Sequence, residues 1–102
     1  MIRVFSKDVG AKLLWHINDP QGVPFDMTGF QAKLFSDTIP AAVAGLDLDL
    51  GDNPDEVQYI TPAPDTIPVG QHTCQVKIYN NAGRELRCIE NRIIGLESRL
   101  TP

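Results

Sequence analysis

The chain has 102 residues, of which 42% are hydrophobic and 22% charged, a composition typical of a single globular domain over residues 1–102. Its formal net charge is −4, because 13 acidic residues outnumber 9 basic ones. An acidic chain lacks the basic face that neutralises phosphates. The charge therefore argues against nucleic-acid partners and against a polybasic membrane anchor.

Two further features bear on where the protein works. The longest apolar stretch, around residues 41–46, is far shorter than the roughly 18 residues that span a bilayer. The N-terminus has no apolar segment followed by a small-residue cleavage site, so we expect no signal peptide and synthesis in the cytoplasm. The two cysteines, Cys74 and Cys88, are too few for a disulfide framework or a four-ligand zinc site.

Proline and glycine, 8 of each, recur between short segments in which apolar and polar residues alternate, a pattern typical of an all-β sandwich or barrel. The first such segment covers residues 11–17 and ends at a turn over residues 19–22. Side chains of a strand alternate between its two faces, so four residues are predicted to face the core: Ala11, Leu13, Trp15 and Ile17. The predicted core around Trp15 also includes residues from later strands: Leu34, Val76 and Ile78.

Three more strands are predicted in the middle of the chain, at residues 30–35, 44–50 and 56–59. In the second of them, leucines alternate with Asp47 and Asp49, so the leucines are expected to face the core. Residues 62–70 contain prolines that cannot donate to a ladder, which excludes a central strand. We expect a long crossover there, with room for one helical turn at residues 65–68.

The last third of the chain is predicted to be a hairpin with a turn at residues 80–83. Val76 and Ile78 on the first arm and Leu86 on the second are expected to face the core, together with both cysteines. The alternation fails after Ile89, where we expect a β-bulge or a change of partner. The predicted fold is therefore an antiparallel, immunoglobulin-like β-sandwich of about seven or eight strands, whose strand order the periodicity does not fix.

Five acidic residues fall within a span of ten: Asp47, Asp49, Asp52, Asp55 and Glu56. Calcium takes six to eight oxygen ligands, which acidic loops supply. The order of residues does not match an EF-hand loop, however, because Gly51 precedes Asp52. The first two aspartates also fall on the outer face of a predicted strand. We interpret the cluster as a solvated face and loop, and a cation site remains the alternative.

The sequence offers no recognisable arrangement for catalysis. His16 and His72 are both predicted to point outward, and no nucleophile motif or phosphate-binding glycine loop accompanies them. We therefore expect no enzyme, no metal and no cofactor. Cys74 and Cys88 share a predicted face, so a cross-strand disulfide is geometrically open. Two reduced core thiols fit a chain without an export signal better.

Two groups of apolar residues are candidates for a partner interface. Leu14, Phe35 and Tyr79 fall on predicted outer faces, where they either form a contact patch or show that the parity of one strand is misassigned. The second group is the apolar end of the predicted hairpin, where the alternation breaks: Ile93, Ile94 and Leu96. We expect this segment to fray in the isolated protein and to become ordered in an assembly.

Several short motifs occur together between Gly10 and Gly83. An alternating strand at residues 12–18 leads through Asp19-Pro20-Gln21-Gly22 to a second turn, Asp26-Met27-Thr28-Gly29, which opens the next strand. Pro64-Asp65-Thr66, Gly70 at a strand start and a polar turn ending at Gly83 follow. In these features the chain resembles the immunoglobulin-like N-terminal domain of the phage baseplate upper protein family. That resemblance implies a virion structural module without catalysis or cofactor, docked onto other virion proteins.

The functional expectation is a structural virion protein of a tailed bacteriophage, a small adaptor in the baseplate or tail that forms a homo- or hetero-oligomeric assembly. Members of the family continue into a helical or fibrous part, whereas this sequence stops at Pro102. Capsid decoration or head-fibre attachment is therefore an alternative. A carbohydrate-binding or adhesion module is a second alternative, although the chain has few aromatic residues to stack on sugar rings. A calcium-binding or metal-dependent domain would rest on the acidic cluster alone.

Overall fold

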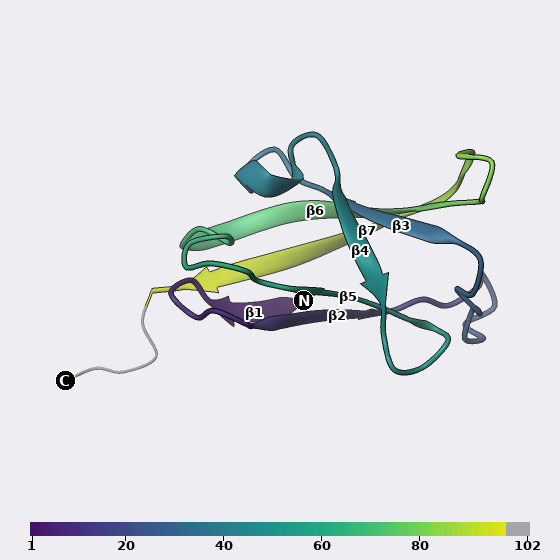
Figure 1. Cartoon of the computed structure of the whole chain (residues 1–102), viewed down its shortest axis with the longest axis horizontal. Helices are drawn as coiled ribbons and strands as arrows, with labels where there is room; N and C mark the ends of the chain where they lie inside the picture. The colour runs from purple at the N-terminus through teal and green to yellow at the C-terminus, as the bar shows by residue number, and fades with distance from the viewer. Residues whose placement is uncertain (98–102) are drawn as a thin grey trace.

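The structure is a computed structural model that describes residues 1–97, and these residues form seven β-strands and one short 3₁₀ helix (Figure 1). The predicted all-β class is therefore confirmed. In chain order the elements are β1 (Ile2–Phe5), β2 (Lys12–His16), β3 (Gln31–Phe35), η1 (Pro40–Ala42), β4 (Leu46–Leu50), β5 (Glu56–Ile60), β6 (Gly70–Tyr79) and β7 (Glu85–Leu96).

The strands are hydrogen-bonded in the order β1-β7-β6-β3-β4-β5-β2. Neighbouring strands are antiparallel except for β1 and β7, which run parallel, so the sheet is mixed and not purely antiparallel as predicted. Residues 46–48 of β4 pair with β3, and residues 49–50 pair with β5. Figure 1 shows β4 crossing from the layer of β3, β6 and β7 to the layer of β5 and β2. The sheet therefore curls into a nearly closed, barrel-shaped body.

The predicted core is confirmed in β2, β3 and β6. Trp15 is only 4% exposed, and the residues expected around it are buried as well: Leu13, Ile17, Leu34, Val76 and Ile78. These residues recur at every second position, because a strand sends alternate side chains into the interior. Burying each large aliphatic side chain contributes about 1.5–3 kcal/mol, so this set dominates the stability of the domain. The prediction that the leucines of β4 face the core holds less well, because Leu50 at the end of the strand is 50% exposed.

The second arm of the hairpin has the opposite parity from the one predicted. Ile78 lies opposite Arg87 and Tyr79 opposite Glu85, so Leu86 is an extra residue that forms a bulge. One inserted residue moves every later side chain to the other face. The prediction that Leu86 and Cys88 face the core is therefore wrong, and both are exposed. The bulge lies before Ile89, not after it.

Three other local features differ from the prediction. The N-terminal residues form β1, where no strand is predicted, and η1 lies in a segment that is expected only to end a strand. Residues 65–68 do not form a helical turn. Asp65 has a positive φ of 61°, and its backbone N–H donates to the Ser6 carbonyl over 2.7 Å, so the crossover is held to the turn after β1.

Candidate functional site

The sheet does not close between its two end strands. Within residues 1–97 no ladder joins β1 to β2, although the short turn at residues 6–11 connects them. A groove of about 480 Å³ lies along this seam. It is lined by Arg3, Val4 and Phe5 from β1 and by residues 8–12 from the turn and the start of β2. The seam thus lies between the two end strands of the sheet.

Hydrogen bonds hold the turn end of the seam in place. The Ser6 N–H donates to the Leu96 carbonyl over 2.9 Å, and the Ser6 hydroxyl donates to the Ile67 carbonyl over 2.7 Å. Asp65 accepts from Lys7 Nζ at 2.8 Å and from the Ser6 hydroxyl at 3.1 Å. These hydrogen bonds, led by that of Lys7, lower the pKa of Asp65. The groove is therefore bordered by a rigid turn at one end.

The backbone of β2 shows which residues present the free edge. The Ala11 carbonyl accepts from Thr61, and the Ile17 N–H donates to Asp55, so the odd-numbered residues bond toward β5. Ladder bonds alternate along an antiparallel strand, so the backbone groups of Lys12, Leu14 and His16 point to the seam. An edge of this kind is a template for pairing with another chain.

Charge around the groove is predominantly positive. Arg3 on β1 and Lys12 on β2 are exposed, and Asp8 is the acid among the lining residues. The two cations lie on opposite sides of the groove, one on each strand. An extended segment that carries acidic side chains would meet both.

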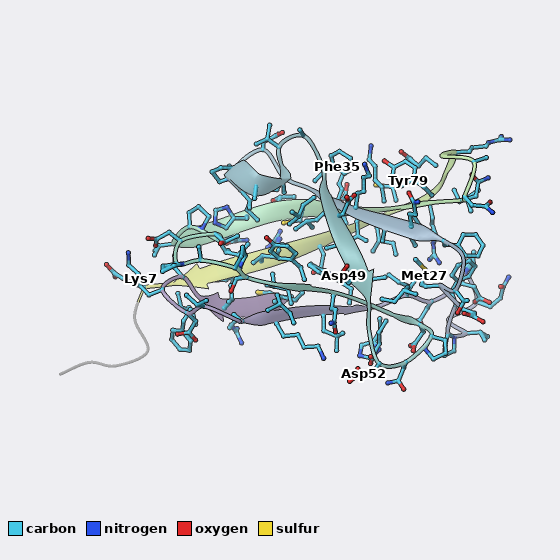
Figure 2. The ribbon with its side chains drawn as sticks, viewed as in Figure 1. Lys7, Met27, Phe35, Asp49, Asp52 and Tyr79 are labelled. Carbon is cyan, nitrogen blue, oxygen red and sulfur yellow. The ribbon has the colours of Figure 1, made fainter. Side chains whose placement is uncertain are left out.

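The predicted outer-face patch is not brought together. Leu14 lies half-buried on β2, and β5 and β4 separate it from Phe35 on β3. Figure 2 places Phe35 and Tyr79 on the side of β3 and β6. Tyr79 pairs with Gln31, at the far end of β3 from Phe35. The Phe35 ring is itself covered by Lys77, whose Nζ lies 5.1 Å from the ring centroid. Of these residues, Leu14 alone borders the seam.

The apolar end of the hairpin is part of the fold. Ile93, Ile94 and Leu96 belong to β7, which lies between β1 and β6. Ile93 is fully buried in the core, and Ile94 and Leu96 are half-buried opposite Arg3 and Phe5. These residues therefore belong to the sheet of the domain and do not form a separate tail. Their apolar character reflects packing between two strands.

The acidic residues of the cluster are spread over β4, the loop after it and β5, and Asp47 and Glu56 make contacts with other side chains. The Asp47 carboxylate lies 3.6 Å from Lys33 Nζ, and Figure 2 shows Asp52 at the tip of its loop, away from Asp49. Glu56 turns back into the loop, where its carboxylate accepts from the Asn53 N–H at 3.2 Å and from Asn53 Nδ2 at 3.0 Å. These bonds, led by that of the Asn53 side chain, lower the pKa of Glu56. Nowhere in residues 1–97 do three His, Cys, Asp or Glu side chains gather around a possible metal position.

The loop itself depends on a glycine. A Cβ atom on Gly51 would lie 2.5 Å from the Cβ of Glu56, closer than any real contact. Only glycine lets the two backbone segments approach so closely. The Gly51 N–H donates to the Glu56 carbonyl over 2.9 Å, which closes the loop. Gly51 is thus required for the close approach of the two sides of this loop.

The histidines differ in environment. His16 is exposed as predicted, with Nδ1 3.4 Å from Asp55. His72 was predicted to point outward and is instead buried, because it shares the parity of Cys74 and Val76 on β6. Its Nδ1 lies 2.7 Å from the Thr38 hydroxyl, and its Nε2 lies 2.8 Å from the Pro68 carbonyl. Both nitrogens are therefore occupied in a structural role.

The two cysteines are free and lie on opposite faces of the hairpin. Cys74 is opposite Asn91, and Cys88 is opposite Lys77. Cys74 is buried, which raises the pKa of its thiol, whereas Cys88 is exposed. A cross-strand disulfide between them is therefore excluded by the register of the hairpin.

The structure contains a second concave site, which no sequence pattern predicts. At the end of the sheet where the loop after β2 approaches the β6–β7 hairpin, a cavity of about 310 Å³ is lined by six residues: Asp19, Pro20, Phe25, Ile78, Leu86 and Arg87. We refer to it below as the end pit. It depends on the bulge at Leu86, which only the hairpin register reveals.

No helix in the described part of the chain is long and apolar enough to cross a membrane. Comparison with known proteins assigns no relationship either, since no family model matches the chain and no curated protein matches it.

Proposed function

We propose that the protein is a non-catalytic docking module, which binds an extended segment of a partner protein along the open seam between β1 and β2. The single observation that carries this proposal is the free edge of β2, where the backbone groups of Lys12, Leu14 and His16 point to the seam. An added strand would pair with these backbone groups and extend the sheet beyond β2. Strand addition of this kind gives affinity through main-chain hydrogen bonds and specificity through alternate side chains.

The side chains around the groove favour an acidic partner segment. Arg3 and Lys12 would lie on either side of the added strand, while Val4 and Ala11 supply apolar lining. Leu14, whose backbone groups point to the seam, extends this edge beyond the turn. It is the predicted interface residue that the proposal retains.

We further propose that the partner is another virion protein of a tailed bacteriophage, as the motifs shared with the baseplate upper protein domain imply. The strand order supports the immunoglobulin-like part of that resemblance. In immunoglobulin-like sandwiches the C, F and G strands form one sheet and the B and E strands belong to the other. Here β3, β6 and β7 are neighbours in that same relation, and β2 pairs with β5. On this assignment β4 links the two sheets.

Attachment to a capsid or head fibre is an alternative location for the same docking mode. The carbohydrate-binding alternative has less support. The aromatic residues all lie within the described range, Trp15 is buried and the other six are half-buried. A sugar platform needs aromatic rings that stand free of the surface. The docking proposal needs only a free strand edge and a groove.

A matched pair of variants tests the proposal. Leu14→Pro removes the backbone N–H that faces the seam without removing a bond to β5, and proline is tolerated on edge strands. Leu14→Ala shortens the same side chain but keeps the N–H. We expect Leu14→Pro to lower incorporation into particles purified from producing cells at least tenfold, and Leu14→Ala to leave it within twofold. Circular dichroism and thermal unfolding verify that both variants fold.

Site-specific photocrosslinking identifies the partner. A benzophenone amino acid at position 14 is expected to crosslink to one structural protein of the particle. The same group at Val43, which is exposed on the loop after η1, is the control and should give no crosslink. Equal incorporation of both Leu14 variants together with no crosslink from position 14 would reject docking at the seam. Absence of the protein from particles would reject the virion assignment.

A further inference from the structure

The end pit lies away from the seam, at the opposite end of β2. Figure 1 shows the loop after β2 and the β6–β7 hairpin at the same end of the molecule, and both contribute to the cavity. Phe25, Ile78 and Pro20 provide apolar walls. Leu86, 49% exposed, stands at the side of the hairpin. None of these residues lines the seam groove.

The bulge explains why a charged residue lines this apolar pit. Because Leu86 is the extra residue, Arg87 lies directly opposite Ile78, whose side chain is 1% exposed and points into the core. Residues opposite each other in a ladder project from the same face. The Arg87 side chain therefore projects from the inner face of β7 and is half-buried at the open end of the barrel-shaped sheet.

The guanidinium of Arg87 makes no side-chain hydrogen bond or ion pair to any residue between 1 and 97. The one acid in the lining, Asp19, is directed to its own loop. Its Oδ1 accepts from the backbone N–H groups of Gln21 and Val23, both at 2.9 Å. A half-buried cation that has no partner among residues 1–97 and lies beside apolar walls is complementary to a ligand with an apolar body and one negative end.

We propose that the end pit binds a small apolar monocarboxylate, with its hydrocarbon part against Phe25, Ile78 and Leu86 and its carboxylate on Arg87. A cavity of about 310 Å³ lies at the lower end of the roughly 300–1,000 Å³ range of ligand pockets, so it suits a small ligand. A phenyl ring on a short chain fits that size. Mouths of barrel-shaped sheets are common ligand sites, and ligands of this size bind weakly, in the high-micromolar to millimolar range.

The test uses three ligands that share one apolar body. The ¹⁵N-labelled protein is titrated with 4-phenylbutyrate, 4-phenyl-1-butanol and 4-phenylbutylamine, and amide shifts are followed by NMR. We expect the acid to bind at least fivefold more tightly than the alcohol, with the amine weakest. The shifted amides should cluster at Phe25, Leu86 and Arg87. Equal affinities for acid and amine, or shifts centred elsewhere, would overturn the proposal.

Variants separate the two halves of the site. Arg87→Gln should weaken the acid at least fivefold, to the level of the alcohol, and leave the alcohol unchanged. Arg84→Gln, an exposed arginine on the same hairpin, is the matched control and should change neither. Leu86→Ser should weaken acid and alcohol alike. An Arg87→Gln protein that binds the acid as the unaltered protein does would refute the role of the guanidinium.

The carboxylate could belong to a free acid or to the end of a polypeptide chain. Titration with acetyl-Gly-Gly-Phe as the free acid distinguishes these sources. Tighter binding than 4-phenylbutyrate assigns the site to a chain end, and weaker binding assigns it to a free acid. Either result supports the same chemistry. The seam proposal is untouched by failure of these titrations, because the two sites share no residues.

Discussion

The Nε2 atom of His72 lies 2.8 Å from the carbonyl oxygen of Pro68, beneath the crossover that joins β5 to β6. A carbonyl can only accept, so Nε2 carries the proton of this hydrogen bond. In the neutral imidazole Nδ1 is then the acceptor, and the Thr38 hydroxyl donates a hydrogen bond to it over 2.7 Å. One buried ring thus connects β6, the crossover and the segment before η1.

Replacement of His72 by phenylalanine is expected to destabilise the domain by roughly 1–3 kcal/mol. The change keeps an aromatic ring but leaves the half-buried Pro68 carbonyl without its donor, and an unsatisfied group of this kind costs about 1–3 kcal/mol. The exposed Thr38 hydroxyl keeps Ser36 and solvent as partners and adds little to this loss. Urea unfolding measures the loss. The neighbouring Thr73→Ala, on the exposed face of β6, should stay within about 0.5 kcal/mol. A His72→Phe protein as stable as the unaltered one would show that the ring is not a structural connector.

Trp15→Ala is expected to cost about 3–5 kcal/mol, because it removes the largest side chain of a closely packed core. Trp15→Phe should cost less than half as much. It leaves a smaller cavity and removes an indole Nε1 that is buried without a partner in residues 1–97. Leu14→Ala, on the outer face of the same strand, is the control. Wild-type stability in the alanine variant would mean that β2 faces the other way.

The inward residues of β2, β3 and β6 were predictable because strand geometry forces alternate side chains to opposite faces. The parity of β7 was not, since it depends on whether the hairpin absorbs an extra residue. The extra residue is visible in the register, where Tyr79 pairs with Glu85 and Ile78 with Arg87. The alternation of apolar and polar residues does not indicate it. The parallel pairing of β1 with β7 joins the two ends of the described chain, which local patterns do not encode.

The candidate sites show the same division. Leu14 was placed on an outer face by periodicity, but only the strand order reveals that its backbone borders an open seam. The apolar segment at Ile93 suggested a surface because its neighbours break the alternation. It is apolar because β7 packs between two strands. Arg87, a charged residue in a half-buried pit, owes its position to the bulge and had no sequence signal.

The two thiols should react at different rates. Cys88 is exposed, whereas Cys74 is buried and the pKa of its thiol is raised by that burial, so less of it is thiolate at any given pH. With an aromatic disulfide reagent at pH 8, we expect one thiol to react quickly in the folded protein and the second only after unfolding. Cys88→Ser should abolish the fast phase. Two fast thiols, or none in the denatured and unreduced protein, would contradict the register of the hairpin.

Glu56 is expected to make stability depend on acid. Hydrogen bonds from Asn53 hold its pKa below the ordinary value of 4.5, so the folded state favours the charged carboxylate. The stabilisation is present above the unfolded pKa and is lost as the pH falls through the lowered folded one. Glu56→Gln should therefore be less stable than the unaltered protein at pH 7, with the difference shrinking below about pH 4.5. Asn53→Ala removes the Nδ2 donor while keeping the carboxylate and the backbone N–H donor, and should reproduce part of this loss. Urea unfolding between pH 7 and pH 3 measures both, and a difference that stays constant over that range would show that the loop does not depend on the charge of Glu56.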